Sequence, residues 1–212
     1  MHNILIQLGA GLHLTGDVAH DVPVFLTYHG WPDIAKHCGA VAAEARRIAA
    51  LVGADPGAAE IAGWLHDISV IIPNEQRAVI AEQLGIDVLP EEAIFPMIIH
   101  QKLSAVLARE IFQIEDSAIL SAVGCHTTLK AGATMLDKVL FVADKLAWDQ
   151  SGYAPFHDQM RAALGYSLDQ AALIYLRYLW GQRARLRVLH PWAQAAYVEL
   201  LRTYAVPHSD TF

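Results

Sequence analysis

A histidine and an aspartate stand side by side in the otherwise apolar segment GWLHDIS at residues 63–69. Burying such an ionisable pair is unfavourable unless something neutralises it, and a metal ion is a common solution. Further histidines and an aspartate occur far away in similarly apolar settings. The complete set is His37, His66, Asp67, His100, His126 and Asp144. These residue types in these settings predict a site for one or two metal ions.

The adjacent pair restricts where a first ion could lie. Neighbouring residues on a helix point about 100° apart, so an ion that both His66 and Asp67 bind must lie beside their helix. Two further ligands from other helices are needed to complete such a site. His37, one helix earlier, and Asp144, near the end of a later helix, are expected to supply them.

His100 and His126 both end apolar runs, and they are expected to hold a second ion that shares the Asp67 carboxylate. Two ions about 3.5–4 Å apart would clamp the attacking and leaving oxygens of a displacement at phosphorus. Imidazole and carboxylate ligands suit Fe, Mn, Zn, Co or Ni better than Ca. For any one histidine taken alone, the alternative is an ordinary hydrogen-bonded residue of the core.

Candidate substrate contacts follow the proposed ligands closely in the sequence. They are Lys102, Thr127, Thr128, Lys130 and Lys145. Ammonium groups and hydroxyls at these positions are expected to bind phosphate oxygens, with Lys130 as the foremost contact. The alternative is that these are ordinary solvated lysines and hydroxyls that satisfy the loop backbone.

The elements that must position these residues are predicted to be helices, because apolar residues recur at the three-and-four spacing and no segment alternates as a strand does. Local signals mark several helix ends: Asp55 with Pro56 at a start, Thr134 at another start, and Gly53 at an end. The fold is therefore predicted to be all-α, a bundle of about ten helices. The expected helices are 32–52, 55–72, 75–84, 90–99 with an interruption at Pro96, 102–112, 117–126, 134–147, 156–164, 167–189 and 191–204.

Composition limits the class of protein. The chain has 212 residues, 54% of them hydrophobic, which suits one domain over residues 31–212 with an N-terminal extension over residues 1–30 packed on it. A net charge of −7 argues against nucleic acid or an anionic membrane as partner. No apolar run approaches a membrane span, and residues 1–10 lack the pattern of a signal peptide. A cytoplasmic protein is expected, and a homodimer is compatible with the sequence.

The ordered set of candidates resembles the HD-domain metal phosphohydrolases, and within them the YqeK family of symmetrical bis(5'-nucleosyl)-tetraphosphatases. The matching segments are AGWLHDI at 62–68, CHTT at 125–128 and DKVLFVAD at 137–144. The resemblance covers about residues 33–200. It implies an all-helical HD fold, an iron site and cleavage of diadenosine tetraphosphate into two ADP.

Carried onto this sequence, the resemblance implies metal ligands and catalytic residues. His66 and Asp67 are the expected catalytic residues, and with His37 and Asp144 they would hold the principal metal. The metal would lower the pKa of a bound water, which would then attack phosphorus near neutral pH. The remaining two histidines would bind the second ion or the substrate phosphates; they are His100 and His126.

Three departures from the family pattern leave alternatives open. The family commonly has a lysine where this chain has Val70, and an acidic-Pro pair and an arginine where residues 145–150 read KLAWDQ. The first 30 residues also exceed the usual start. One alternative is a nucleotidase or phosphodiesterase of the same superfamily that acts on another phosphoester. The other is a catalytically silent nucleotide-binding regulatory module, which would bind nucleotide without turnover.

Overall fold

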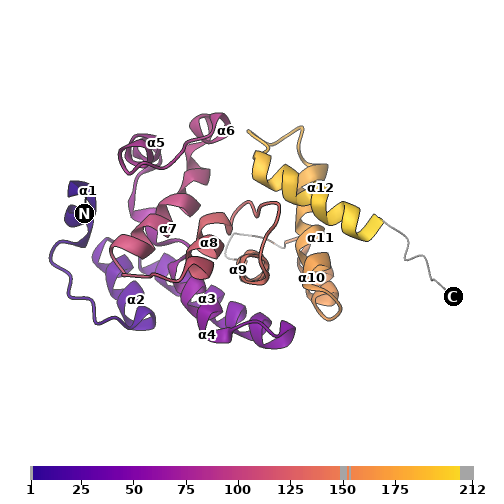
Figure 1. Ribbon diagram of the computed structural model, residues 1–212, viewed down its shortest axis with the longest axis horizontal. Helices are drawn as coiled ribbons and strands as arrows, with labels where there is room; N and C mark the ends of the chain where they lie inside the picture. The colour runs from indigo at the N-terminus through magenta and orange to yellow at the C-terminus, as the bar shows by residue number, and fades with distance from the viewer. Residues whose placement is uncertain (1, 149–151, 153, 206–212) are drawn as a thin grey trace.

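The computed structural model describes residues 2–148, 152 and 154–205 of the chain, and these form helices and no strand (Figure 1). The prediction of an all-α fold is confirmed. Twelve α-helices and two 3-10 helices (η) follow in the order α1 Asn3–Gly9, α2 Val18–Tyr28, α3 Pro32–Val52, α4 Pro56–Leu65, η1 Ile68–Ile71, α5 Asn74–Gln83, α6 Pro90–Ile94, η2 Pro96–Ile99, α7 His100–Glu110, α8 Ser117–Cys125, α9 Met135–Leu146, α10 His157–Leu164, α11 Leu168–Gly181 and α12 Pro191–Ala205.

The N-terminal segment packs against the helices that follow it. The Asp17 carboxylate caps α2 by accepting a hydrogen bond from the Ala19 amide. Val22, Phe25 and Leu26 on α2 are fully buried within the main hydrophobic core. No helix was expected over residues 3–9, because this stretch shows little periodicity. The division between an extension and a main domain remains a prediction.

Helices α3 and α4 lie unusually close together, because a glycine faces the backbone of the neighbouring helix. A Cβ atom added at Gly63 would lie 2.5 Å from the Ala42 Cα atom, so only glycine fits there without a shift of backbone. Asp55 caps α4 through the amides of Gly57 and Ala58, as the sequence predicts. This close approach brings His37 on α3 near the end of α4.

Helix α9 occupies the centre of the molecule, between α3, α4 and α8 on one side and α10 and α11 on the other (Figure 1). Residues 139–143 have no exposed surface, so the helix is apolar around nearly its whole circumference. Thr134 and Asp137 form a reciprocal capping box at its start. Asp144 near its end is thereby held in the interior.

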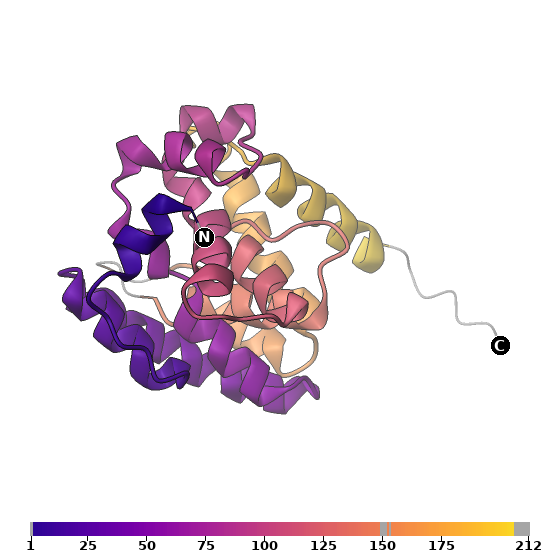
Figure 2. The ribbon, with the colours of Figure 1, turned by 60° about the vertical axis from the view of Figure 1, so that its left-hand side comes forward.

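The C-terminal helices α10, α11 and α12 form one side of the molecule, and Figure 2 shows α12 crossing beside α11. Helix α11 ends at Gly181, so the prediction of one helix over residues 167–189 is wrong in its second half. The interruption between the predicted helices 134–147 and 156–164 includes residues 149–151 and 153, which lie outside the described residues. Among the helices that the structure describes, none has both the length and the apolar composition to cross a membrane.

Candidate metal centre

Three histidines share one local arrangement at a helix end. His66 ends α4, His126 ends α8, and His100 joins η2 to α7. In each, the ring Nδ1 lies within hydrogen-bond distance of the carbonyl oxygen three residues earlier, at 2.7 Å in His66, 2.9 Å in His126 and 2.6 Å in His100. A carbonyl can only accept, so Nδ1–H donates and the neutral ring keeps a lone pair on Nε2. The backbone thus orients three Nε2 atoms as candidate ligands.

The first group of candidate ligands lies around the Nε2 atom of His66. This atom lies 3.3 Å from His37 Nε2, 3.5 Å from Asp67 Oδ2 and 3.7 Å from Asp144 Oδ1. The His37 Nε2 and Asp144 Oδ1 atoms are 3.4 Å apart. Residues 37 and 144, which are more than one hundred positions apart in the sequence, therefore meet at the His66-Asp67 pair.

The second group uses the other oxygen of the same aspartate. Asp67 Oδ1 lies 3.3 Å from His100 Nε2 and 3.5 Å from His126 Nε2, and these two nitrogens are 3.0 Å apart. The Thr127 hydroxyl lies 2.9 Å and 3.0 Å from the same two nitrogens, but it has only one proton to donate. Asp67 therefore presents one oxygen to each group.

The pKa values of the cluster suit metal ligation. Burial lowers the pKa of His66 and lowers that of His100 to about 4, against the opposing effect of the Asp67 charge. Burial raises the pKa of Asp67, but the neighbouring histidines outweigh it and hold that pKa well below its usual range. Near neutral pH these imidazoles are neutral and this carboxylate is ionised, which are the protonation states that metal ligands need.

The donor set fits one or two divalent cations. When every Nδ1 donates to a carbonyl, lone pairs on His100 and His126 face each other at 3.0 Å with a carboxylate oxygen beside them. Acceptors that converge in this way are stabilised by a shared cation. The atoms of His37, His66 and Asp67 lie within 4.8 Å of one another, as do those of Asp67, His100 and His126. The assignment of these residues as ligands remains a prediction.

A buried glutamine holds the loop after α8 against α7. The Gln101 side-chain oxygen accepts hydrogen bonds from the amides of Thr127 and Thr128, at 3.1 Å and 3.3 Å, and its amide donates to the Thr128 hydroxyl at 3.1 Å. The Thr128 hydroxyl also lies 2.9 Å from the Leu129 carbonyl. Thr128 is thus engaged in the loop, whereas Thr127 reaches the histidines.

A cavity of about 270 Å³, named here the Lys145 cavity, opens over the candidate centre. Beside the candidate ligands, it is lined by Met97, Thr127, Lys145, Trp148 and Tyr175. The Lys145 ammonium donates to Asp144 Oδ2 at 2.6 Å and to the His126 carbonyl at 2.8 Å. Burial opposes ionisation of Asp144, but this lysine holds the pKa of Asp144 well below its usual value.

Two of the expected phosphate contacts lie elsewhere. Lys102 donates to Glu92 at 2.7 Å and to the Asp87 carbonyl at 2.8 Å. Lys130 donates to Ser121 at 2.7 Å and lies 3.6 Å from Asp137. Neither lysine lines the Lys145 cavity, because each ammonium is held by its own partners away from the site.

Arg77 is a buried cation near the centre that the sequence analysis missed. It lines a second cavity together with Asp67 and His100. It precedes Ile80 and Ala81 of α5, both buried, at the three-and-four spacing of one helix face. A charged residue on the apolar face of a helix was the signal that could have identified it.

Comparison with known proteins gives one family and one fold. The family model described as HD domain matches residues 34–149. The chain is 49% identical over 140 residues to "Uncharacterized protein in pepC 5'region" of Lactococcus lactis subsp. cremoris, covering 66% of this chain and 71% of that protein. It is 31% identical over 139 residues to the symmetrical bis(5'-nucleosyl)-tetraphosphatase of Bacillus subtilis, covering 65% and 72%.

A solved structure shares the fold. It is the crystal structure of a predicted HD superfamily hydrolase involved in NAD metabolism from Clostridium acetobutylicum, with a TM-score of 0.80 and 23% sequence identity. The match covers 91% of this chain and 100% of that chain. At this identity the likeness supports the fold alone.

Proposed function

This chain belongs to the HD domain family of metal-dependent phosphohydrolases, and from that premise we propose that it hydrolyses diadenosine tetraphosphate symmetrically to two ADP. The Bacillus subtilis relative carries the name of this activity at 31% identity. The observation that carries the proposal is the placement of Asp67, whose two oxygens face two separate groups of candidate ligands.

His37, His66, Asp67 and Asp144 would hold the principal ion. His100 and His126 would hold a second ion or contact phosphate. Iron is the proposed metal, and Mn, Zn, Co and Ni suit the same donors. A bound divalent cation lowers the pKa of a water ligand and polarises phosphoryl oxygens.

The chain's own groups would orient the substrate and offset its charge. The hydroxyl of Thr127 can donate to a phosphoryl oxygen, and the Lys145 ammonium lies at the cavity wall beside Asp144. In the reaction, a water oxygen bonds to one of the two central phosphorus atoms, and the bond from that atom to the bridging oxygen breaks. The bridging oxygen leaves on the second ADP as an anion, and the proton lost by the water passes to solvent.

Elemental analysis of protein purified without chelators, paired with product analysis over a panel of nucleotides, tests the proposal. We expect bound metal and ADP as the sole nucleotide product from diadenosine tetraphosphate. Asp67→Ala and His66→Ala should each lose metal and activity, whereas Asp33→Ala, on the exposed start of α3, should keep both.

Three outcomes would reject the proposal or part of it. Full activity and metal content in Asp67→Ala would reject the metal centre. AMP and ATP as products would reject symmetrical cleavage. Nucleotide binding without turnover, after Fe or Mn is supplied, would favour the regulatory alternative.

A further inference from the structure

A second cavity adjoins the candidate centre on the side away from Lys145. It has a volume of about 290 Å³ and is named here the Arg77 cavity. It shares Asp67, Met97 and His100 with the Lys145 cavity, so the two cavities meet at the Asp67 carboxylate. Its other walls include Trp31 and Arg77. A molecule bound at the centre could therefore extend in two directions.

Arg77 is a buried guanidinium that lacks an anionic partner. Only 6% of its surface is exposed. Its Nε atom donates to the Ile72 carbonyl at 3.0 Å and its Nη1 atom to the Met97 carbonyl at 3.1 Å. No carboxylate among the described residues lies within ion-pair distance of it. A buried charge without a counter-charge is unfavourable, and arginine binds phosphate through paired N–H groups. An anionic ligand would complete this environment.

The charged group that acts on Arg77, the Asp67 carboxylate, belongs to the candidate centre. Burial lowers the pKa of the Arg77 guanidinium, and the charge of Asp67 acts in the opposite direction. The Asp67 oxygens nevertheless lie against the histidines rather than against Arg77. Val70 also lines the Arg77 cavity and brings no charge to it. Arg77 is thus the cation of this cavity among the residues that line it.

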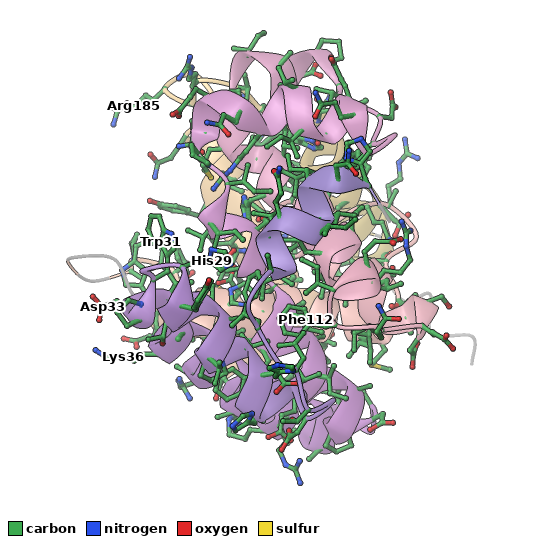
Figure 3. All side chains as sticks on the ribbon, turned by 90° about the vertical axis from the view of Figure 1, so that its left-hand side faces the viewer. His29, Trp31, Asp33, Lys36, Phe112 and Arg185 are labelled. Atoms are coloured by element: carbon green, nitrogen blue, oxygen red, sulfur yellow. The ribbon has the colours of Figure 1, made fainter. Side chains whose placement is uncertain are left out.

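Trp31 provides an aromatic surface at the same cavity. It precedes Pro32 at the start of α3 and is 42% exposed. Figure 3 shows Trp31 at the outer edge of the molecule, on the same side as Asp33 and Lys36. Half-exposed tryptophan beside a cationic group is suited to stacking on a nucleobase.

The two cavities are matched in their chemistry. One has Arg77 and Trp31; the other has Lys145 and Trp148. The buried Nε1 atom of Trp148 has no hydrogen-bond partner among the described residues, so it can donate to a ligand. Each cavity offers one cation and one tryptophan, and the two meet at Asp67.

We propose that the Arg77 cavity binds one nucleoside-phosphate half of the substrate, with Arg77 on the phosphate and Trp31 on the base, while the Lys145 cavity binds the other half. The proposal rests on the proposed function for the identity of the two halves. The proposal thus gives Arg77 the role of phosphate-binding cation in a cavity that is also lined by Val70, the position at which the family commonly has a lysine.

ADP binding to the metal-loaded protein, measured by isothermal titration calorimetry, tests this without requiring turnover. We expect two ADP per chain in the native protein. Arg77→Gln should weaken one of the two sites about tenfold or more, and Arg77→Lys should do so less. For diadenosine tetraphosphate, Arg77→Gln should raise KM by a similar factor with little change in kcat. Arg109→Gln, which removes an exposed arginine, is the matched control and should change neither value.

The outcomes separate this proposal from the proposed function. Unchanged ADP affinity and KM in folded, metal-loaded Arg77→Gln would overturn the Arg77 assignment alone. Arg77-dependent ADP binding without cleavage would leave the assignment standing and reject the proposed reaction. Should Arg77→Gln not fold, Trp31→Ala provides the test. It should weaken the same ADP site about threefold or more, compared with Tyr166→Ala at an exposed aromatic residue that lines neither cavity. Equal affinity in these two variants would overturn the proposal.

Discussion

The buried ionisable side chains around Glu92 and those around Asp67 differ in how their polar atoms are satisfied. Around Glu92, which has no exposed surface, the carboxylate accepts hydrogen bonds from Lys102 at 2.7 Å and the Leu89 amide at 2.9 Å, and it lies 3.1 Å from His190 Nε2. The His190 Nδ1 atom accepts from the Trp192 amide at 3.2 Å. Donors face acceptors throughout this group, so it needs no ligand.

Around Asp67, acceptors face acceptors. In His66, His100 and His126 the proton lies on Nδ1 and is donated to a backbone carbonyl, so the lone pairs on Nε2 converge on a carboxylate. A shared cation satisfies such a group, because its members have too few protons to donate to one another. The comparison teaches that burial of charge does not by itself indicate a site. What indicates a site is a buried group whose members cannot satisfy one another.

The largest expected effect comes from Asp67→Asn, compared with Glu92→Gln. Asparagine keeps the shape of Asp67 but lacks the negative charge that faces both groups of candidate ligands. We therefore expect kcat/KM to fall by about 10³-fold or more. Bound metal, measured by elemental analysis, should fall with it. Glu92→Gln should retain kcat/KM within about twofold per folded molecule. Similar losses of kcat/KM in the two variants would contradict the distinction between the group around Glu92 and the candidate site around Asp67.

Stability should show the opposite order. Glu92→Gln leaves the Lys102 ammonium and His190 buried without their anion, so the free energy of unfolding should fall by about 3 kcal/mol. Urea denaturation of the metal-loaded protein measures this loss. A decrease in the free energy of unfolding of less than about 1 kcal/mol would mean that the Glu92–Lys102 pair contributes no more than a solvated surface ion pair does.

How stability depends on pH sharpens the contrast further. In the metal-free protein, burial lowers the pKa of His100 to about 4, whereas the unfolded chain has a histidine pKa of about 6.5. The unfolded state therefore binds more protons between these values, and stability should fall as pH drops from about 6.5 to 4, by about 3 kcal/mol. Burial raises the pKa of Glu92, but His190 and Lys102 hold it below its usual value, so its contribution is lost only below about pH 4.5.

Urea denaturation at a series of pH values, with and without chelator, measures this window. His100→Asn should flatten the dependence between pH 6.5 and 4, because the titrating imidazole is absent. Metal-loaded protein should keep its stability to lower pH until protons displace the metal. A metal-free protein whose stability is constant over this range would contradict the neutral, buried state of His100.

Much of the helical architecture could be predicted because helix ends carry local chemical signals. Asp55 with Pro56, Thr134 and the positive-φ Gly53 mark the ends that the structure has. The convergence on the His66-Asp67 pair could also be expected, since polar residues that can bind metals stood in apolar runs. Such residues must find partners in the interior.

The positions of the charged ends of long side chains could not be predicted. Lys102 is two residues from His100, but its ammonium donates to the Glu92 carboxylate and to the Asp87 carbonyl. Arg77 is ten residues from Asp67 and lines the same cavity. Flexible stems carry the charge several ångströms from the backbone, and tertiary partners decide its direction. The end of α11 at Gly181 was missed for a different reason. Leu186, Val188 and Leu189 continue the apolar pattern, but the chain beyond Gly181 forms turns and a loop.

The smallest expected effect concerns Lys130, which the sequence singled out as the foremost phosphate contact. Its ammonium is held by Ser121 and Asp137, so Lys130→Met should leave kcat/KM within about twofold and lower stability by less than about 1 kcal/mol. Lys145→Met is the matched variant. It removes the ammonium beside Asp144 in the cavity wall and should lower kcat/KM about tenfold or more. Steady-state kinetics on both variants measures the difference. The reverse order would place the phosphate chain over the loop at Lys130, as the sequence alone suggests, and would move the substrate out of the two cavities that meet at Asp67.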